Sequence, residues 1–440
     1  MNGHHESYSL LDGNSPAIGG PPYFGNPDNC LGGVQTNADI PGIDTQSSMK
    51  TASNPRALRI FVLHWFALEQ YPPVMNLLNY FSGLEDCQVA VCSTHNDRGL
   101  AEYTNPSVGL SRIQFPSRRL SRFRRLLAFL QFPLLALCRL IRFRPDIVLY
   151  IEPHSSFPAT LFGLINHRHR LFIHYHEYCE PDHFYVPGMR IIAIYHWFEK
   201  AFLYRHAEWI SQTNAVRVRM FCEDHPHVHR SKLRVLPNLP PAAWQKTTER
   251  SWIAHPQDTV KLLYVGAVSL HDTFIAELVE WLRRQRDGQF SLDVYSTNCD
   301  GAARDFLNRS AGPNLRFHSE GIPYDTLPDV LPEFHVGLIL YKANTTNYVY
   351  NETNKLFEYL ACGLDVWYPR QMLGIKPHAR THSVPRVIEL DFERLDEMPV
   401  AQFRSRAGLP FDPFNRRCED VLCGLKHAMT AVPELSNDVP

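Results

Sequence analysis

The sequence predicts an α/β protein made of two facing Rossmann-like domains with a cleft between them. Short apolar strands alternate with helical segments in residues 57–240, and the same alternation recurs in residues 258–405. A polar segment at 241–257, next to a pair of prolines, separates the two series. Strand–helix–strand alternation implies right-handed crossovers and parallel sheets. Such sheets bind ligands beyond the carboxyl ends of their strands, so we expect the site in the cleft.

The composition narrows the class of protein. With 440 residues, 44% of them hydrophobic, the chain is long enough for roughly two or three domains with large cores. The formal charge of -1 gives no positive field of the kind that nucleic-acid binding needs, so we expect no nucleic-acid partner. The ten cysteines form no Cys-x-x-Cys pair, which is typical of reduced thiols in a cytoplasmic protein.

Residues 1–56 are rich in Gly, Pro, Ser and Asn and show no sustained periodicity, so we expect a disordered tail. They contain no basic segment followed by an apolar run, so no secretory signal is expected. No uncharged apolar stretch reaches the roughly 18–20 residues that span a bilayer. The sequence therefore predicts a cytoplasmic protein, either free or peripheral on the inner face of the plasma membrane.

The N-terminal domain, residues 57–240, begins with a predicted strand at 58–63. Its continuous apolar run is typical of a buried parallel strand, and a helix at 74–81 follows after a loop. Further strands and helices are predicted at residues 88–93, 144–151, 157–165, 170–175, 191–206, 208–211, 214–223 and 232–236.

Polar side chains follow three of these strands, at the edge where α/β sheets bind ligands. His64 follows the first strand, and Glu152 and His154 follow the strand that ends at Ile151. His176 and Glu177 follow the next strand along the chain. The nearby histidines and cysteines do not have a zinc-site spacing, and no Gly-x-Gly-x-x-Gly is present, so we expect neither a metal nor a dinucleotide cofactor.

Residues 112–144 combine nine arginines with no acidic residue, and they surround an apolar core at 126–137 that Pro133 interrupts. A basic amphipathic segment of this kind can lie on an anionic membrane surface. It can equally be an ordinary domain helix whose arginines face water. The residues alone leave both interpretations open.

The C-terminal domain, residues 258–405, begins with a predicted strand at 260–265, and an amphipathic helix is expected at 274–284. The next strands and helices are predicted at residues 291–296, 301–308, 315–318, 327–331 and 335–340. The last segment, 406–440, should contain a helix that packs back across the linker.

A polar loop, a short helix and a strand are predicted in residues 341–368. Asn354 is one of several good N-cap types at the start of the helix, and Lys355 and Glu358 share a face near its N-terminus. A helix N-terminus carries free backbone N–H groups and a partial positive charge, so it can bind a phosphate. Glu358 could accept hydrogen bonds from the hydroxyls of a sugar. The alternative is an exposed ion pair of little consequence.

The run Asn-Lys-Leu-Phe-Glu-Tyr-Leu-Ala-Cys-Gly-Leu at 354–364 resembles the glycosyltransferases of the GT-B fold, in the broad group of retaining, family-4-like enzymes (glycosyl transferases group 1). Three weaker matches accompany it, at 235–238, 263–266 and 321–328. The resemblance extends over residues 58–368 and implies two Rossmann-like domains, with the nucleotide-sugar bound by the second.

The resemblance also suggests roles for single residues. Glu358 matches the second of the two family glutamates, which holds the nucleotide ribose, whereas the first glutamate falls on Tyr350. The Arg and Lys that bind the diphosphate in the family are missing after the strand that ends before Gly266. Lys355 is then the best cation for the phosphates, with Lys342 as a second candidate. We assign Gly266, Lys342, Asn354, Lys355 and Glu358 to the nucleotide-sugar.

The function implied is transfer of a sugar from a nucleotide-sugar to a glycan or lipid-linked acceptor in polysaccharide or glycoconjugate biosynthesis, with retention and without a metal. His176 and Glu177 are the candidate catalytic residues, and His64, Glu152 and His154 are candidates for the acceptor side. Two alternatives stay open. One is a non-catalytic binding or assembly subunit, and the other is a sugar-nucleotide 2-epimerase.

Overall fold

The structure is a computed structural model. It describes residues 56–96, 99–114, 122–186, 188–245, 259–286, 288–398, 404, 406 and 408–431. The predicted disordered tail lies outside the described residues apart from Arg56, and so does most of the predicted linker.

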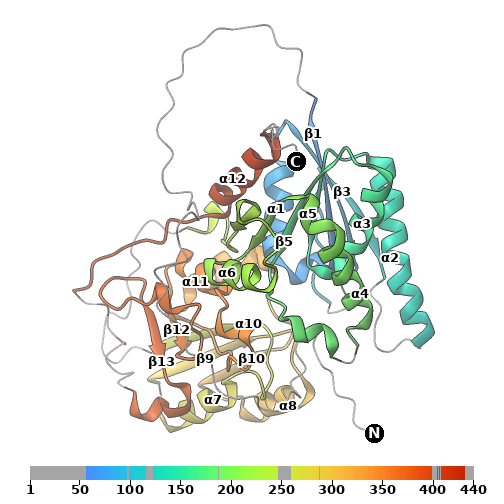
Figure 1. The fold of residues 1–440 in the computed structure, drawn as a ribbon. Helices are drawn as coiled ribbons and strands as arrows, with labels where there is room; N and C mark the ends of the chain where they lie inside the picture. The colour runs from blue at the N-terminus through green and yellow to red at the C-terminus, as the bar shows by residue number, and fades with distance from the viewer. Residues whose placement is uncertain are drawn as a thin grey trace, which may run out of the picture.

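Two parallel sheets with flanking helices make up the described chain (Figure 1), which confirms the predicted α/β fold class. The first has seven strands in the order β3-β2-β1-β4-β5-β6-β7. Its strands are β1 (Leu58–Ala67), β2 (Cys87–Thr94), β3 (Val108–Ile113), β4 (Ile147–Ile151), β5 (Arg170–Tyr175), β6 (Ala207–Gln212) and β7 (Leu233–Val235).

The second sheet has six strands in the order β10-β9-β8-β11-β12-β13. Its strands are β8 (Val260–Val265), β9 (Phe290–Tyr295), β10 (Leu315–His318), β11 (Val336–Leu338), β12 (Asp365–Pro369) and β13 (Val387–Leu390). Every strand pair in both sheets is parallel. The carboxyl ends of each set of strands therefore share one edge.

Helices cover the sheets. They are α1 (Pro72–Ser82), α2 (Arg122–Phe143), α3 (Ser156–Ile165), α4 (Arg190–Phe198), α5 (Tyr204–His206), α6 (Ala215–Asp224), α7 (Ile275–Arg284), α8 (Gly301–Ser310), α9 (Leu327–Val330), α10 (Thr346–Val349), α11 (Asn354–Ala361) and α12 (Cys418–Thr430). A π-helical stretch joins α4 to α5, within the single helix predicted there.

Three elements differ from expectation. β1 continues through His64 to Ala67 where a loop was predicted, because His64 still pairs with Ile151 of β4. β3 and β13 were not predicted as strands. The basic segment is helical, as both interpretations allowed, and α2 runs through Pro133.

α12 returns to the N-terminal domain and packs against α1. The Arg170 guanidinium at the start of β5 donates to the carbonyl oxygens of Met429 at 2.6 Å and Ala428 at 2.9 Å. Lys426 forms an ion pair with Asp86 at 2.7 Å. The chain thus crosses between the two domains twice, once after β7 and once before α12. The contacts of α12 with the N-terminal domain connect the domains on that side.

A buried ion cluster stabilises the C-terminal domain where β12 begins. Asp365 is fully buried and accepts hydrogen bonds from the side chains of Arg386 at 2.7 Å and Arg406 at 2.8 Å. The Arg386 backbone N–H donates to the same carboxylate. Asp365 therefore has a structural role at the start of β12.

Candidate functional site

The buried carboxyl group of Glu152 organises the turn after β5. Glu152 follows β4 with a φ of 67°, a left-handed backbone conformation that is uncommon outside glycine. Its Oε1 accepts hydrogen bonds from the backbone N–H groups of His176 at 2.7 Å and Glu177 at 3.0 Å. Burial, together with the charge of Glu177, raises the pKa of Glu152 to about 8. Glu152 therefore positions both candidate catalytic residues through their backbone.

A chain of hydrogen bonds sets the tautomer of His176. Ser211 Oγ–H donates to the Ile173 carbonyl at 3.2 Å, so the Ser211 oxygen accepts from His174 Nδ1 at 2.9 Å. His174 Nε2 is then an acceptor, facing His176 Nδ1 at 3.3 Å, and Asn238 Oδ1 lies 3.0 Å from the same nitrogen. Nδ1 of His176 is thus the protonated nitrogen, and Nε2 carries a lone pair.

His176 Nε2 is buried and has no hydrogen-bond partner among the residues that the structure describes. Burial lowers the pKa of His176 to about 4, so the ring is neutral near pH 7. A neutral ring with a lone pair on Nε2 can accept a hydrogen bond or a proton from a ligand hydroxyl.

The other two predicted histidines lie deeper in the N-terminal domain. His64 is fully buried within β1, and its ring lies 4.7 Å from that of Tyr71. Burial lowers the pKa of His64 well below its usual value, and it lowers the pKa of His154 to about 3. The structure therefore places His64 within β1 rather than in the loop that was expected to follow this strand.

Sequence reasoning missed Arg217, a fully buried arginine in the first turn of α6. Its Nη1 donates to the His176 carbonyl at 2.7 Å and to Thr213 Oγ1 at 2.9 Å. Its Nη2 donates to both the backbone carbonyl and the side-chain oxygen of Asn347, which belongs to α10 of the C-terminal domain. The guanidinium therefore has acceptors from both domains.

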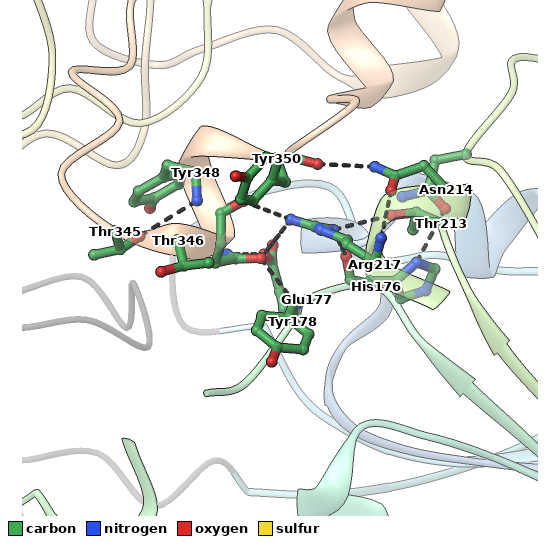
Figure 2. Close-up of polar contacts among 12 residues, drawn as sticks. His176, Glu177, Tyr178, Thr213, Asn214, Arg217, Thr345, Thr346, Tyr348 and Tyr350 are labelled. Carbon is green, nitrogen blue, oxygen red and sulfur yellow. Dashed lines mark hydrogen bonds and ion pairs between the residues drawn. The ribbon is translucent and has the colours of Figure 1, made fainter. Parts of the chain in front are cut away.

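Asn347 connects the two domains through its side chain. Its Oδ1 also accepts from the Tyr178 backbone N–H at 2.9 Å, and its Nδ2 donates to Glu177 Oε2 at 2.5 Å. We call Glu177, Tyr178, Arg217 and Asn347 the interdomain bridge. Figure 2 shows Glu177 and Arg217 converging below the α10 segment. This bridge holds the Glu177 carboxylate at the boundary between the domains.

Two further contacts support the bridge. Asn214 Nδ2 donates to the carbonyl of Tyr350 at 2.8 Å (Figure 2). The Thr346 backbone N–H donates to Glu180 Oε1 at 3.2 Å. Tyr350 stands where the resembled family has its first glutamate, and its backbone here joins the two domains.

In the C-terminal domain, Lys355 is a half-buried cation in the first turn of α11. Its Nζ lies 3.2 Å from the Tyr341 hydroxyl, and a Cβ added to Gly266 would come within 2.9 Å of it. Burial alone would lower the pKa of Lys355, but the neighbouring Tyr341 and Glu358 outweigh burial and raise it. Glu177, in the N-terminal domain, adds to this rise in pKa.

Glu358 is buried, one turn after Asn354. Its Oε1 accepts a hydrogen bond from Asn354 Nδ2 at 2.6 Å, and burial raises its pKa against the opposing effect of Lys355. The alternative of an exposed ion pair is wrong, because Glu358 is buried and Lys355 is half-buried. Lys342 is instead paired with Glu277 at 2.7 Å and donates to the Leu270 carbonyl.

The structure thus places the predicted residues in two groups, one in each domain. One group contains His176, Glu177 and Glu152, and the other contains Gly266, Lys355 and Glu358. In the described part of the chain, no group of three or more His, Cys, Asp or Glu side chains is placed to hold a metal ion. Arg217 and Asn347 had no signal in the sequence, because they lie 130 residues apart and pair only after folding.

No protein-family model and no curated protein sequence matches this chain. Solved structures do match it. A lipopolysaccharide outer core galactosyltransferase in its apo form has a TM-score of 0.53 at 12% identity, covering 84% of this chain and 98% of its own. The sucrose-phosphate synthase of Thermosynechococcus elongatus has a TM-score of 0.55 at 13% identity, covering 85% and 96%.

An α,α-trehalose-phosphate synthase (UDP-forming) from Burkholderia vietnamiensis matches with a TM-score of 0.54 at 12% identity, covering 85% of this chain and 96% of its own. Identities this low establish the fold only. The two parallel sheets and these neighbours show that the chain has the GT-B fold predicted from the sequence.

Proposed function

We propose that this protein is a glycosyltransferase that moves a sugar from a nucleotide-sugar donor to a glycan or lipid-linked acceptor. The observation that carries the proposal is the half-buried Lys355 at the N-terminus of α11, whose Nζ lies 3.2 Å from the Tyr341 hydroxyl in space left open by Gly266. The GT-B fold supports it, since the structural neighbours include a galactosyltransferase and a UDP-forming synthase.

Lys355 is proposed to bind the diphosphate of the donor. When the bond between the sugar C1 and the diphosphate oxygen breaks, negative charge develops on that oxygen. A protonated Lys355 and the free N–H groups at the start of α11 stabilise this charge without a metal ion. Gly266 has a φ of 139° and no side chain, which leaves the space that Lys355 occupies.

Glu358 is proposed to accept hydrogen bonds from the ribose hydroxyls. One of its oxygens is already held by Asn354, which fixes the carboxylate in one orientation. Lys355 in the first turn and Glu358 one turn later lie on the same side of α11, so one nucleotide can contact both.

His176 and Glu177 are proposed to act at the reacting sugar. A new bond forms between the acceptor oxygen and C1, and the acceptor hydroxyl loses its proton to His176 Nε2 or to the departing diphosphate. The lone pair on Nε2 suits the first route. Glu177, whose carboxylate the interdomain bridge holds in place, faces the developing positive charge on the sugar. His64, Glu152 and His154 are proposed for the acceptor side, Glu152 acting through the backbone of the turn after β5.

The proposal is tested with Lys355→Ala and Glu358→Ala, with Lys376→Ala as the matched control because Lys376 is an exposed lysine of the same domain. Both site variants should lower donor turnover at least about tenfold, as expected for loss of charge stabilisation in a buried site. A thermal-shift screen of nucleotide-sugars finds the donor, because a ligand at 100 times its dissociation constant adds about 2.7 kcal/mol of stability. Near-normal kinetics in both variants would refute the site.

A further inference from the structure

Large apolar side chains are exposed on one side of the N-terminal domain. In the described part of the chain, eleven large hydrophobic residues are exposed, and ten of them lie between Phe123 and Trp197. Five of the ten belong to α2, two to the end of α3, two to α4, and Tyr185 to the short helix Pro181–Tyr185. The eleventh, Leu373, lies in the C-terminal domain.

On α2 these residues form a single stripe at intervals that keep them on one helical face. Together with the exposed Cys138, they are Phe123, Leu127, Leu130, Leu134 and Ile141. The opposite face, which contains Phe132, Ala136 and Leu140, is buried in the N-terminal core. With 22 residues α2 is about 33 Å long, so the stripe is an extended outer surface.

The three helices that contain most of these exposed residues lie side by side. α3 packs against both α2 and α4. Figure 1 shows the three helices at the outer side of the N-terminal domain, away from the C-terminal domain. We call their exposed apolar surface the three-helix face. It consists of the α2 stripe together with Leu164, Ile165, Ile194 and Trp197.

The charges around this face have one sign. α2 contains five arginines, and none of the three helices contains an aspartate or a glutamate. Exposed cations border the face at Arg139, Arg142, Arg168, Arg190 and Lys200. Helices that combine exposed apolar side chains with arginines and contain no acidic residue complement an anionic bilayer, whose headgroups attract the cations while the acyl region takes the apolar side chains. A helix that pairs with another helix more often alternates both signs beside its apolar strip.

We propose that the three-helix face docks this protein on an anionic lipid bilayer, with α2 lying in the plane of the headgroups. In the described part of the chain no helix is long and apolar enough to cross a membrane. Contact is therefore peripheral. The proposal rests on the surface of the N-terminal domain and not on the proposed transferase activity.

The experiment measures sedimentation of the full-length protein with vesicles of phosphatidylcholine and phosphatidylglycerol, and with vesicles of phosphatidylcholine alone. The test variant is Leu127→Glu/Leu134→Glu, and the matched control is Leu373→Glu, which changes an exposed leucine outside the face. All three leucines are exposed, so the variants should keep the thermal midpoint of the wild type. We expect binding to the anionic vesicles only, weakened at least about tenfold in the double variant and unchanged in the control.

A second measurement keeps the proposal falsifiable if the double variant misfolds. In the wild type, anionic vesicles should protect Cys138 from alkylation and leave the exposed Cys423 of α12 reactive, as read by peptide mass spectrometry. Equal binding to both vesicle types, or no protection of Cys138, overturns the proposal. Association of the wild type without vesicles that the double variant abolishes also overturns it, in favour of a second copy on this face.

Discussion

Replacing Asn347 by alanine should favour an open arrangement of the two domains, and it should also lower turnover. The substitution removes three hydrogen bonds that cross between the domains. Two of these involve the charged side chains of Arg217 and Glu177, and the third holds the Tyr178 backbone N–H. The backbone carbonyl of residue 347 still accepts from Arg217 at 2.8 Å, so the guanidinium keeps one partner across the boundary.

The size of the effect follows from these contacts. Each hydrogen bond to a charged group contributes about 1.5–3 kcal/mol and the neutral one about 1 kcal/mol, so the closed arrangement loses roughly 4–7 kcal/mol. Opening of the domains limits the loss, because the freed groups then reach water. We expect the open form to gain at least about a hundredfold in population relative to the closed one.

Small-angle scattering measures the opening as a larger radius of gyration, and steady-state kinetics measure its effect on turnover. Asn344→Ala is the matched control, since Asn344 is an exposed residue of the loop that leads into α10 and its side chain donates within its own domain, to the His271 carbonyl. A fall in kcat with a radius of gyration like that of the control would show that Asn347 does not hold the domains closed. Unchanged values of both would refute the role of the interdomain bridge.

Three further predictions concern single residues. Gly266→Ala should lower donor turnover at least about tenfold, because its Cβ would lie 2.6 Å from Lys355 Cε and displace that side chain. Asp365→Ala should lower the free energy of unfolding in urea by about 3–5 kcal/mol, because two buried guanidinium groups lose their carboxylate. Glu152 has a raised pKa in the folded state, so it binds more protons there than in the unfolded chain, and its contribution to stability falls as the pH rises from about 4.5 to about 8. Glu152→Gln should therefore become more stable than the wild type across that window, by up to roughly 5 kcal/mol. Thermal unfolding of both proteins at each pH measures this. A difference in stability between variant and wild type that does not change with pH would contradict the raised pKa of Glu152.

The sequence predicted most strands because buried parallel strands are continuous apolar runs, as in β1, β4 and β8. It missed β3 and β13, which are short edge strands with polar or charged residues (VGLSRI and VIEL). An edge strand has a partner on one side only, and a polar side chain there can face water. Its apolar pattern is correspondingly weak.

Candidate site residues could be predicted from the sequence in both domains, but the contacts that join the domains could not. Asn354, Lys355 and Glu358 lie within one turn and a half of one helix, so local spacing together with a family resemblance made them candidates. Arg217 and Asn347 are joined only by the approach of two domains, and neither has a distinctive neighbour in the sequence. The burial of His64 was not predicted either. A histidine after an apolar run normally indicates the end of a buried strand, whereas β1 continues past His64.

The most direct test of the account is product analysis of the wild type and Lys355→Ala with a set of nucleotide-sugars and with glycan and lipid-linked acceptors. The account predicts release of the nucleoside diphosphate and attachment of the sugar to an acceptor, both reduced at least about tenfold in Lys355→Ala. Conversion of a nucleotide-sugar without any acceptor would indicate an epimerase instead. Binding of a nucleotide-sugar without turnover by the wild type would contradict catalysis and favour a binding subunit.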